Sequence, residues 1–151
     1  MRLLILFAAF FIFGTTIVFS QDKRITKTGQ ITFEASVPSF EEVKAVNQTI
    51  SCILNTKTGE IASLALMKGF HFKRALMEEH FNENFIESDQ FPKAIFKGMI
   101  KEFNIAAIDS QGTKYTINGT LTLHGEIKQI NVTALIKKIG SDLELTSTFN
   151  L

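Results

Sequence analysis

The residues that could catalyse a reaction or bind a metal are few, and their spacing fits neither role. The chain has three histidines, His71, His80 and His124, and one cysteine, Cys52. The histidines are too scattered for a metal-ligand motif, and no cysteine or pair of carboxylates joins them at ligand spacing. We therefore expect no metal site, and we interpret His80 as a structural histidine held by hydrogen bonds.

Acid–base and nucleophilic chemistry lack support as well. Glu78 and Glu79 are neighbours, and neighbouring side chains on a helix diverge by about 100°, so they cannot act together on one substrate atom. The Gly-x-Ser-x-Gly elbow, the Walker loop and the Gly-x-Gly-x-x-Gly fingerprint are all missing from the sequence. We predict that the protein is not an enzyme and uses no cofactor.

Cys52 is the only cysteine, so no disulfide can form within the chain. Ile50 and Leu54 share its face in an alternating segment, which favours a buried and inert thiol. The alternative is a reactive thiol, or one that pairs with another chain.

Residues 1–20 have the features of a secretory signal peptide. Arg2 gives a basic start, residues 3–18 are almost all apolar, and Ser20 lies where a signal peptidase would cut. The alternative is an uncleaved membrane anchor, because the apolar run nearly reaches the length that spans a bilayer. We expect cleavage near Ser20 and export of residues 21–151, to the periplasm or outside the cell, as a single domain.

The charge balance excludes two classes of partner. Of the 16 basic residues, Arg2 lies in the leader, which leaves 15 basic residues against 15 acidic ones. A neutral domain lacks the basic face that nucleic acids and anionic membrane surfaces attract. We therefore expect neither as a partner.

Most of residues 21–151 alternates apolar and polar side chains, as strands with one buried face do. Turn-forming residues separate these segments at hairpin spacing, which predicts an antiparallel meander. One such segment places Val46 on the same face as Ile50, and another places Leu64 and Leu66 opposite Ile61, so that strand is expected to be covered on both sides. The alternation alone does not distinguish a sandwich from a closed barrel.

Residues 73–82 break the period of two. Phe72, Leu76, Met77 and Phe81 fall on one face of a short helix. The charged residues run from basic to acidic, against the helix dipole, so the helix must be held mainly by its apolar face. We predict a short plug helix laid across the β-structure.

Small residues on or near the inward parity would leave a tunnel inside this structure. An eight-stranded barrel is near the size at which side chains either fill the interior or leave room for one small ligand. The alternative is therefore an ordinary packed core. The small residues are Ala35, Ser63, Ala65, Gly98, Gly119, Ala134 and Ser147.

Six short motifs are, in their order, similar to those of the YceI-like family, lipocalin-like proteins that bind polyisoprenoids and other lipids. The resemblance covers roughly residues 28–149. It implies an all-β protein, an antiparallel barrel of about eight strands with an apolar cavity, and a bacterial source. The motifs are Gly29-x-Ile31-x-Phe33, Thr58-Gly59-x-Ile61, Leu76-Met77-x-x-His80-Phe81-Asn82, Glu87-Ser88, Phe91-Pro92-x-Ala94-x-Phe96-x-Gly98 and Gly119-x-Leu121-Thr122-x-His124-Gly125.

The resemblance therefore implies an exported protein that holds a polyisoprenoid or similar long-chain lipid in the barrel. The apolar side chains around the plug and on the inward strand faces would line its cavity. These are Phe33, Ala35, Ile61, Ala65, Met67, Phe70, Phe72, Leu76, Met77, Phe81, Phe96, Ile100 and Leu121.

Two further expectations concern partners. The alternative to lipid binding is a filled barrel that acts as a structural or protein-interaction module, with Leu64 and Leu66 facing a partner. Members of the family usually continue past the strand that contains Phe149. We therefore expect either a truncated form of a longer protein or a homodimer that closes the exposed edge with a second copy.

Overall fold

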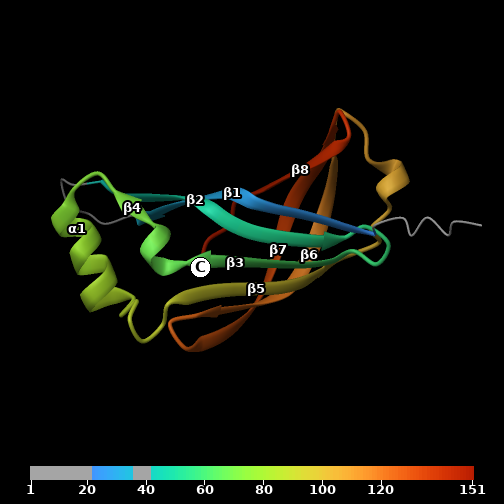
Figure 1. Ribbon diagram of the computed structural model, residues 1–151. Coiled ribbons are helices and arrows are strands. Elements are labelled where there is room, and N and C mark those ends of the chain that lie inside the picture. The colour runs from blue at the N-terminus through green and yellow to red at the C-terminus, as the bar shows by residue number, and fades with distance from the viewer. Residues whose placement is uncertain (1–21, 36–41) are drawn as a thin grey trace, which may run out of the picture.

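The computed structural model describes residues 22–35 and 42–151. The expected leader, residues 1–20, lies outside this part. Strands make up most of the described chain, with one short α-helix (Figure 1). The elements are β1 Lys23–Ala35, β2 Val43–Asn55, β3 Glu60–Leu66, β4 His71–Phe72, α1 Ala75–His80, β5 Lys93–Ile100, β6 Thr113–Leu123, β7 Glu126–Ile139 and β8 Asp142–Ser147. Short 3₁₀ turns lie at Met67–Gly69 and Ile105–Ala107.

One antiparallel sheet contains these strands, in the order β1-β2-β3-β5-β6-β7-β8, with β4 paired to β2. The sheet curls into a half-barrel, and α1 lies across one end of it (Figure 1). The predicted fold class, a lipocalin-like antiparallel barrel with a plug helix, is confirmed in this form. β1 and β8 are the two edges, and within residues 22–35 and 42–151 no ladder joins them.

Strand β2 departs from the predicted alternation in its first half. Ala45 and Asn47 are fully buried, whereas Val46 is only partly buried and does not share a face with Ile50. The reason is an irregularity in the pairing with β1, whose register shifts on both sides of Gly29. One extra residue in a strand moves every later side chain to the other face.

The outer face of strand β3 is only partly covered. Ile61 and Ala65 are buried on the concave face, but Leu66 on the opposite face is 48% exposed. The expectation of a strand covered on both sides is therefore wrong at Leu66. The reason is that the helical elements of the described chain lie at the ends of the half-barrel and not over its convex face (Figure 1).

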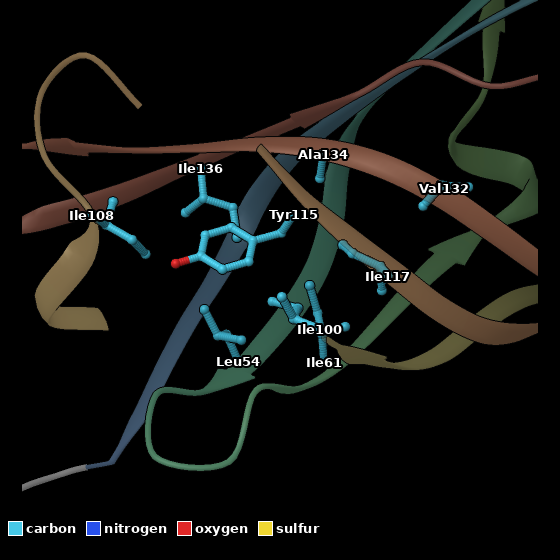
Figure 2. Packing of buried hydrophobic residues seen from close by; sticks show 9 residues of the cluster. All are labelled: Leu54, Ile61, Ile100, Ile108, Tyr115, Ile117, Val132, Ala134 and Ile136. Carbon is cyan, nitrogen blue, oxygen red and sulfur yellow. The ribbon is translucent and has the colours of Figure 1, made fainter. Parts of the chain in front are cut away.

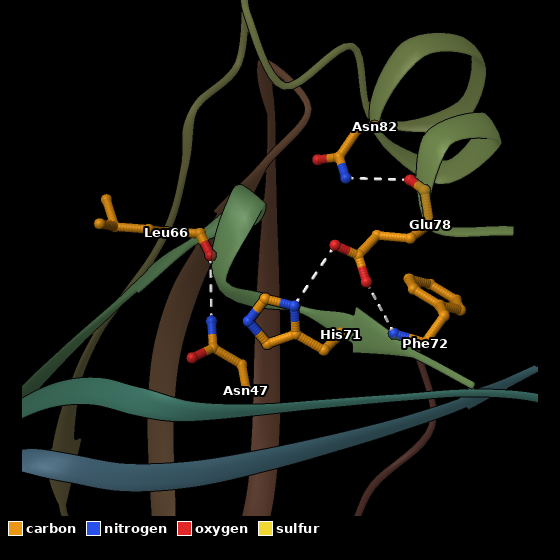
Figure 3. Close-up of polar contacts among 6 residues, drawn as sticks. All are labelled: Asn47, Leu66, His71, Phe72, Glu78 and Asn82. Carbon is orange, nitrogen blue, oxygen red and sulfur yellow. Dashed lines mark hydrogen bonds and ion pairs between the residues drawn. The ribbon is translucent and has the colours of Figure 1, made fainter. Parts of the chain in front are cut away.

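The plug helix forms, but later in the chain than the pattern predicts. α1 spans Ala75–His80 and continues as a π-helical turn at Phe81–Phe85, so the helical part runs over 75–85 and not 73–82. Glu78 joins the plug to β4. Its Oε2 accepts a hydrogen bond from the Phe72 backbone N–H at 3.0 Å, and its Oε1 lies 3.3 Å from His71 Nδ1 (Figure 3). Packing of the apolar face is thus not the only contact that holds the plug.

The buried apolar side chains form two clusters, one toward each end of the half-barrel. The first surrounds Tyr115, whose hydroxyl donates a hydrogen bond to the Asn104 carbonyl at 3.2 Å. Figure 2 shows its members pointing toward one another from β2, β3, β5, β6 and β7. The second, which we call the plug cluster, contains Ala45, Ile50, Ala65, Met67 and Phe70.

Asn47 links β2 to the end of β3 near the plug, and its buried side chain is hydrogen-bonded. Its side chain is fully buried. The Nδ2 group donates to the Leu66 carbonyl at 3.0 Å (Figure 3), and Oδ1 accepts from the Thr49 backbone N–H and hydroxyl at 2.9 and 2.8 Å. Because each of these groups has a partner, burial of the amide carries no large desolvation penalty.

Candidate functional site

A hollow of about 820 Å³ lies along the concave face of the half-barrel. This volume is in the upper part of the range of about 300–1,000 Å³ typical of small-molecule sites. Strands β2, β3, β5, β6 and β7 supply its floor, and both edge strands, β1 and β8, contribute to its rim. The hollow therefore reaches both unpaired edges of the sheet.

The lining is mostly apolar because alternation along each strand directs aliphatic side chains to the concave face. Its polar members are Thr26, Gln30, Ser63 and Ser147, with Cys52 among them, and its charged members are Lys23, Arg24 and Asp142. The apolar members are Ile25, Ile31, Ile50, Leu54, Ile61, Ala65, Ala94, Phe96, Ile117, Leu121, Ile130, Val132, Ile136, Leu143, Leu145 and Phe149.

Four of the predicted lining residues line this hollow: Ile61, Ala65, Phe96 and Leu121. Ile100 is buried in the cluster around Tyr115 instead. The rest belong to the plug or lie beside it, outside the described lining of the hollow. They are Phe33, Ala35, Met67, Phe70, Phe72, Leu76, Met77 and Phe81, of which Leu76 is 60% exposed.

The aromatic residues of the plug pack on one another. The Phe81 ring centre lies 5.0 Å from that of Phe72, 6.1 Å from Phe70 and 6.3 Å from Phe33. Such distances are those of favourable ring pairs. No described residue of the segment 67–85 lines the hollow. The plug is therefore a packed wall at one end of the half-barrel. At this end the interior is an ordinary packed core and not a tunnel.

Gly98 and Gly119 do not open a tunnel, contrary to the expectation from their size. They pair with each other across β5 and β6, and the Phe96 ring lies over both. A Cβ atom on Gly119 would lie 2.4 Å from Phe96 Cζ and 2.6 Å from the Lys97 carbonyl oxygen. These glycines make room for the ring, which then lines the hollow itself. The small residues that do line it are Ser63, Ala65, Ala94 and Ser147, together with Gly29.

Cys52 lies in the lining of the hollow and is half-buried. Desolvation by burial raises the pKa of its thiol above the usual value. Because the thiolate is the reactive form, a raised pKa makes the thiol less reactive at neutral pH. This agrees with the prediction of an inert thiol, and it provides a chemical reporter inside the hollow.

The histidines take structural or exposed positions. His124 Nε2 lies 2.8 Å from Glu87 Oε2, and its ring meets Phe91 edge-on at 4.6 Å. These contacts fasten the loop after the plug to the β6–β7 hairpin. His80 is exposed and its ring makes no hydrogen bond within the described chain, so its interpretation as a hydrogen-bonded histidine is wrong. Among the described residues, no group of three His, Cys, Asp or Glu side chains could hold a metal ion.

Most of the lining that β1, β7 and β8 contribute was not predicted, although Ser147 on β8 was among the small residues expected beside the tunnel. Ile130 and Val132 could have been predicted, because apolar and polar residues alternate in their segment of the sequence. Nothing in the sequence marks Lys23 and Arg24 as lining residues, since charged residues at the start of a strand ordinarily face solvent. Only the three-dimensional curl of the sheet brings them to the hollow.

Comparisons with known proteins identify related structures. The family model of the YceI-like domain matches residues 10–151. A polyisoprenoid-binding domain from Saccharophagus degradans, implicated in plant cell wall breakdown, is similar with a TM-score of 0.68 and 13% identity, over 80% of this chain and 70% of that one. A YceI protein from Campylobacter jejuni is similar with a TM-score of 0.55 and 15% identity, over 73% of this chain and 64% of that one. At these identities the two structures show a shared fold. No curated protein matches the sequence significantly.

Proposed function

Because the chain belongs to the YceI-like domain family, we propose that it is a binding protein that holds one polyisoprenoid or similar long-chain lipid in the hollow. The observation that carries this proposal is the hollow itself, with its volume of about 820 Å³ and its mostly apolar lining. The Saccharophagus degradans neighbour is described as a polyisoprenoid-binding domain, which supports the same class of ligand. The family and this neighbour favour binding over catalysis.

Burial of apolar surface is sufficient to drive such binding. If a lipid tail buries about 500 Å² at roughly 25 cal/mol per Å², the gross gain is about 12 kcal/mol. Lost translation and the ordering of a flexible tail remove about half of that gain. The remainder of about 6 kcal/mol corresponds to a Kd of tens of micromolar without any hydrogen bond, so selectivity would follow from length and shape.

In this proposal the ligand enters between β1 and β8, the two edge strands of the sheet. β1 and β8 both line the hollow and no described ladder joins them, whereas the plug is packed shut at its end. The size of the hollow also disfavours the filled-barrel alternative, in which the interior would have no room for a guest. Residues 1–20 support export of the domain, and the lipid would then be carried outside the cytoplasm.

Protection of Cys52 tests the site. A small apolar thiol reagent should label Cys52 slowly at neutral pH and faster as the pH rises toward the raised pKa of the thiol. A prenyl lipid at about ten times its Kd should lower the labelling rate about ten-fold by occupying the hollow.

A matched control places the thiol outside the hollow. The double variant Cys52→Ala, Thr116→Cys carries its thiol on an exposed residue of β6 that does not line the hollow. Its labelling rate should be the same with and without lipid. Unchanged labelling of Cys52 at saturating lipid would show that the lipid binds elsewhere.

A further inference from the structure

The charges in the lining of the hollow gather at one end. Lys23 and Arg24 begin β1, Asp142 begins β8, and all three line the hollow. β1 starts at the end of the half-barrel opposite α1 (Figure 1). The hollow thus has a charged end near the start of β1, while the rest of its lining, toward the plug, is apolar with a few neutral polar groups.

The register of β1 against β2 places Arg24 on the inner side. Arg24 pairs with Leu54 and Thr26 with Cys52. Residues directly opposite each other in a ladder share a face of the sheet. Because Leu54 and Cys52 both line the hollow, Arg24 is on the face that borders the site and not on the convex face.

Arg24 has no partner in the described chain. No ion pair or side-chain hydrogen bond joins Lys23, Arg24 or Asp142 to another described residue. The two cations outnumber the one carboxylate, so this end of the hollow has a positive balance. A guanidinium offers a planar pair of N–H groups that matches the oxygens of a carboxylate or a phosphate.

We propose that Arg24, with Lys23 beside it, binds the anionic head group of the lipid, a carboxylate or a phosphate, while the tail runs along the apolar lining toward the plug. This inference rests on the proposed function and specifies the ligand class for the same site. From Arg24 to Ile31, β1 borders the hollow over about 23 Å at roughly 3.3 Å per residue. The apolar lining residues Leu54 and Ile50 of β2 lie beside this stretch and give a long tail an apolar path.

Pairs of lipids that differ only in the head group test this assignment. The pairs are hexadecanoic acid against hexadecanol and geranylgeranyl phosphate against geranylgeraniol, each titrated below its micelle concentration at neutral pH and low salt. The wild-type chain should bind the anionic member of at least one pair about ten-fold or more tightly. The preference should shrink as salt is added, because the site is open to solvent. A preference in the first pair alone identifies a carboxylate, and one in the second alone identifies a phosphate.

Arg24→Gln should strongly reduce the preference, because only Lys23 remains at this end, and it should leave the affinity for the neutral lipids nearly unchanged. Lys27→Gln is the matched control, since Lys27 is an exposed cation of β1 outside the described lining of the hollow, and it should keep the preference. Equal binding of both members of each pair by the wild-type chain, or an undiminished preference in Arg24→Gln, would overturn the assignment while lipid binding itself stands. If the wild-type chain bound none of the four lipids, the proposed function would fail as well.

Discussion

Replacing Ala94 by Phe should reduce lipid affinity by at least about ten-fold, which corresponds to 1.4 kcal/mol. Ala94 is half-buried in β5 and lines the hollow opposite Ala65 in the ladder with β3. A phenyl ring at this position would occupy space that the tail needs. The measurement is a lipid titration of both chains, together with thermal unfolding to verify that the variant folds.

Ala62→Phe is the matched control for this experiment. Ala62 is also half-buried and lies on β3, but it alternates with the lining residues Ile61 and Ser63 and so falls on the convex face. The same change there should leave lipid affinity within about two-fold, because differences below about 0.5 kcal/mol are typical away from a site. Equal loss in the two variants would indicate that the hollow is not where the lipid binds.

Among the variants considered, Phe81→Ala should lower the stability of the fold most. Phe81 contacts three other aromatic rings and packs against the plug cluster. Because the side chain is partly exposed, Phe81→Ala should lower the free energy of unfolding by about 2–4 kcal/mol, somewhat less than a fully buried Phe. Denaturant unfolding followed by circular dichroism measures this change.

Leu76→Ala serves as the comparison on the same helix. Leu76 is 60% exposed, so its truncation should change the free energy of unfolding by less than about 0.5 kcal/mol. Lipid affinity should be unaltered in both variants under conditions where they are folded, since no described residue of the segment 67–85 lines the hollow. Loss of lipid binding by folded Phe81→Ala would show that the plug takes part in the site.

The strand faces could be predicted from the sequence because alternation is a local property. Ile61 and Ala65 on β3, and Leu121 on β6, line the hollow as the alternation of their strands predicts. The slip at Val46 could not be predicted, since it depends on how β2 pairs with a distant strand and not on its own residues. The plug helix was visible as a change of period, but its π-helical extension at Phe81–Phe85 was not.

The position of the hollow was the hardest feature to predict. A packed core and a cavity lining can have the same Phe- and Met-rich sequence near the plug. Only the packing of these side chains in the structure distinguishes the two. Phe96 illustrates the difficulty: its ring covers Gly98 and Gly119 and cancels the space that two glycines would otherwise leave. The homodimer and the truncated form, expected from the edge strand, both stay predictions.

Native mass spectrometry of the folded chain tests the central claim most directly. The protein, stripped of bound lipid and then given one equivalent of geranylgeranyl phosphate or geranylgeraniol, should show a single lipid adduct per chain. The adduct should be retained by Ala62→Phe and lost by Ala94→Phe. A folded wild-type chain that takes up no lipid, or an Ala94→Phe chain that carries the same adduct, would contradict the account.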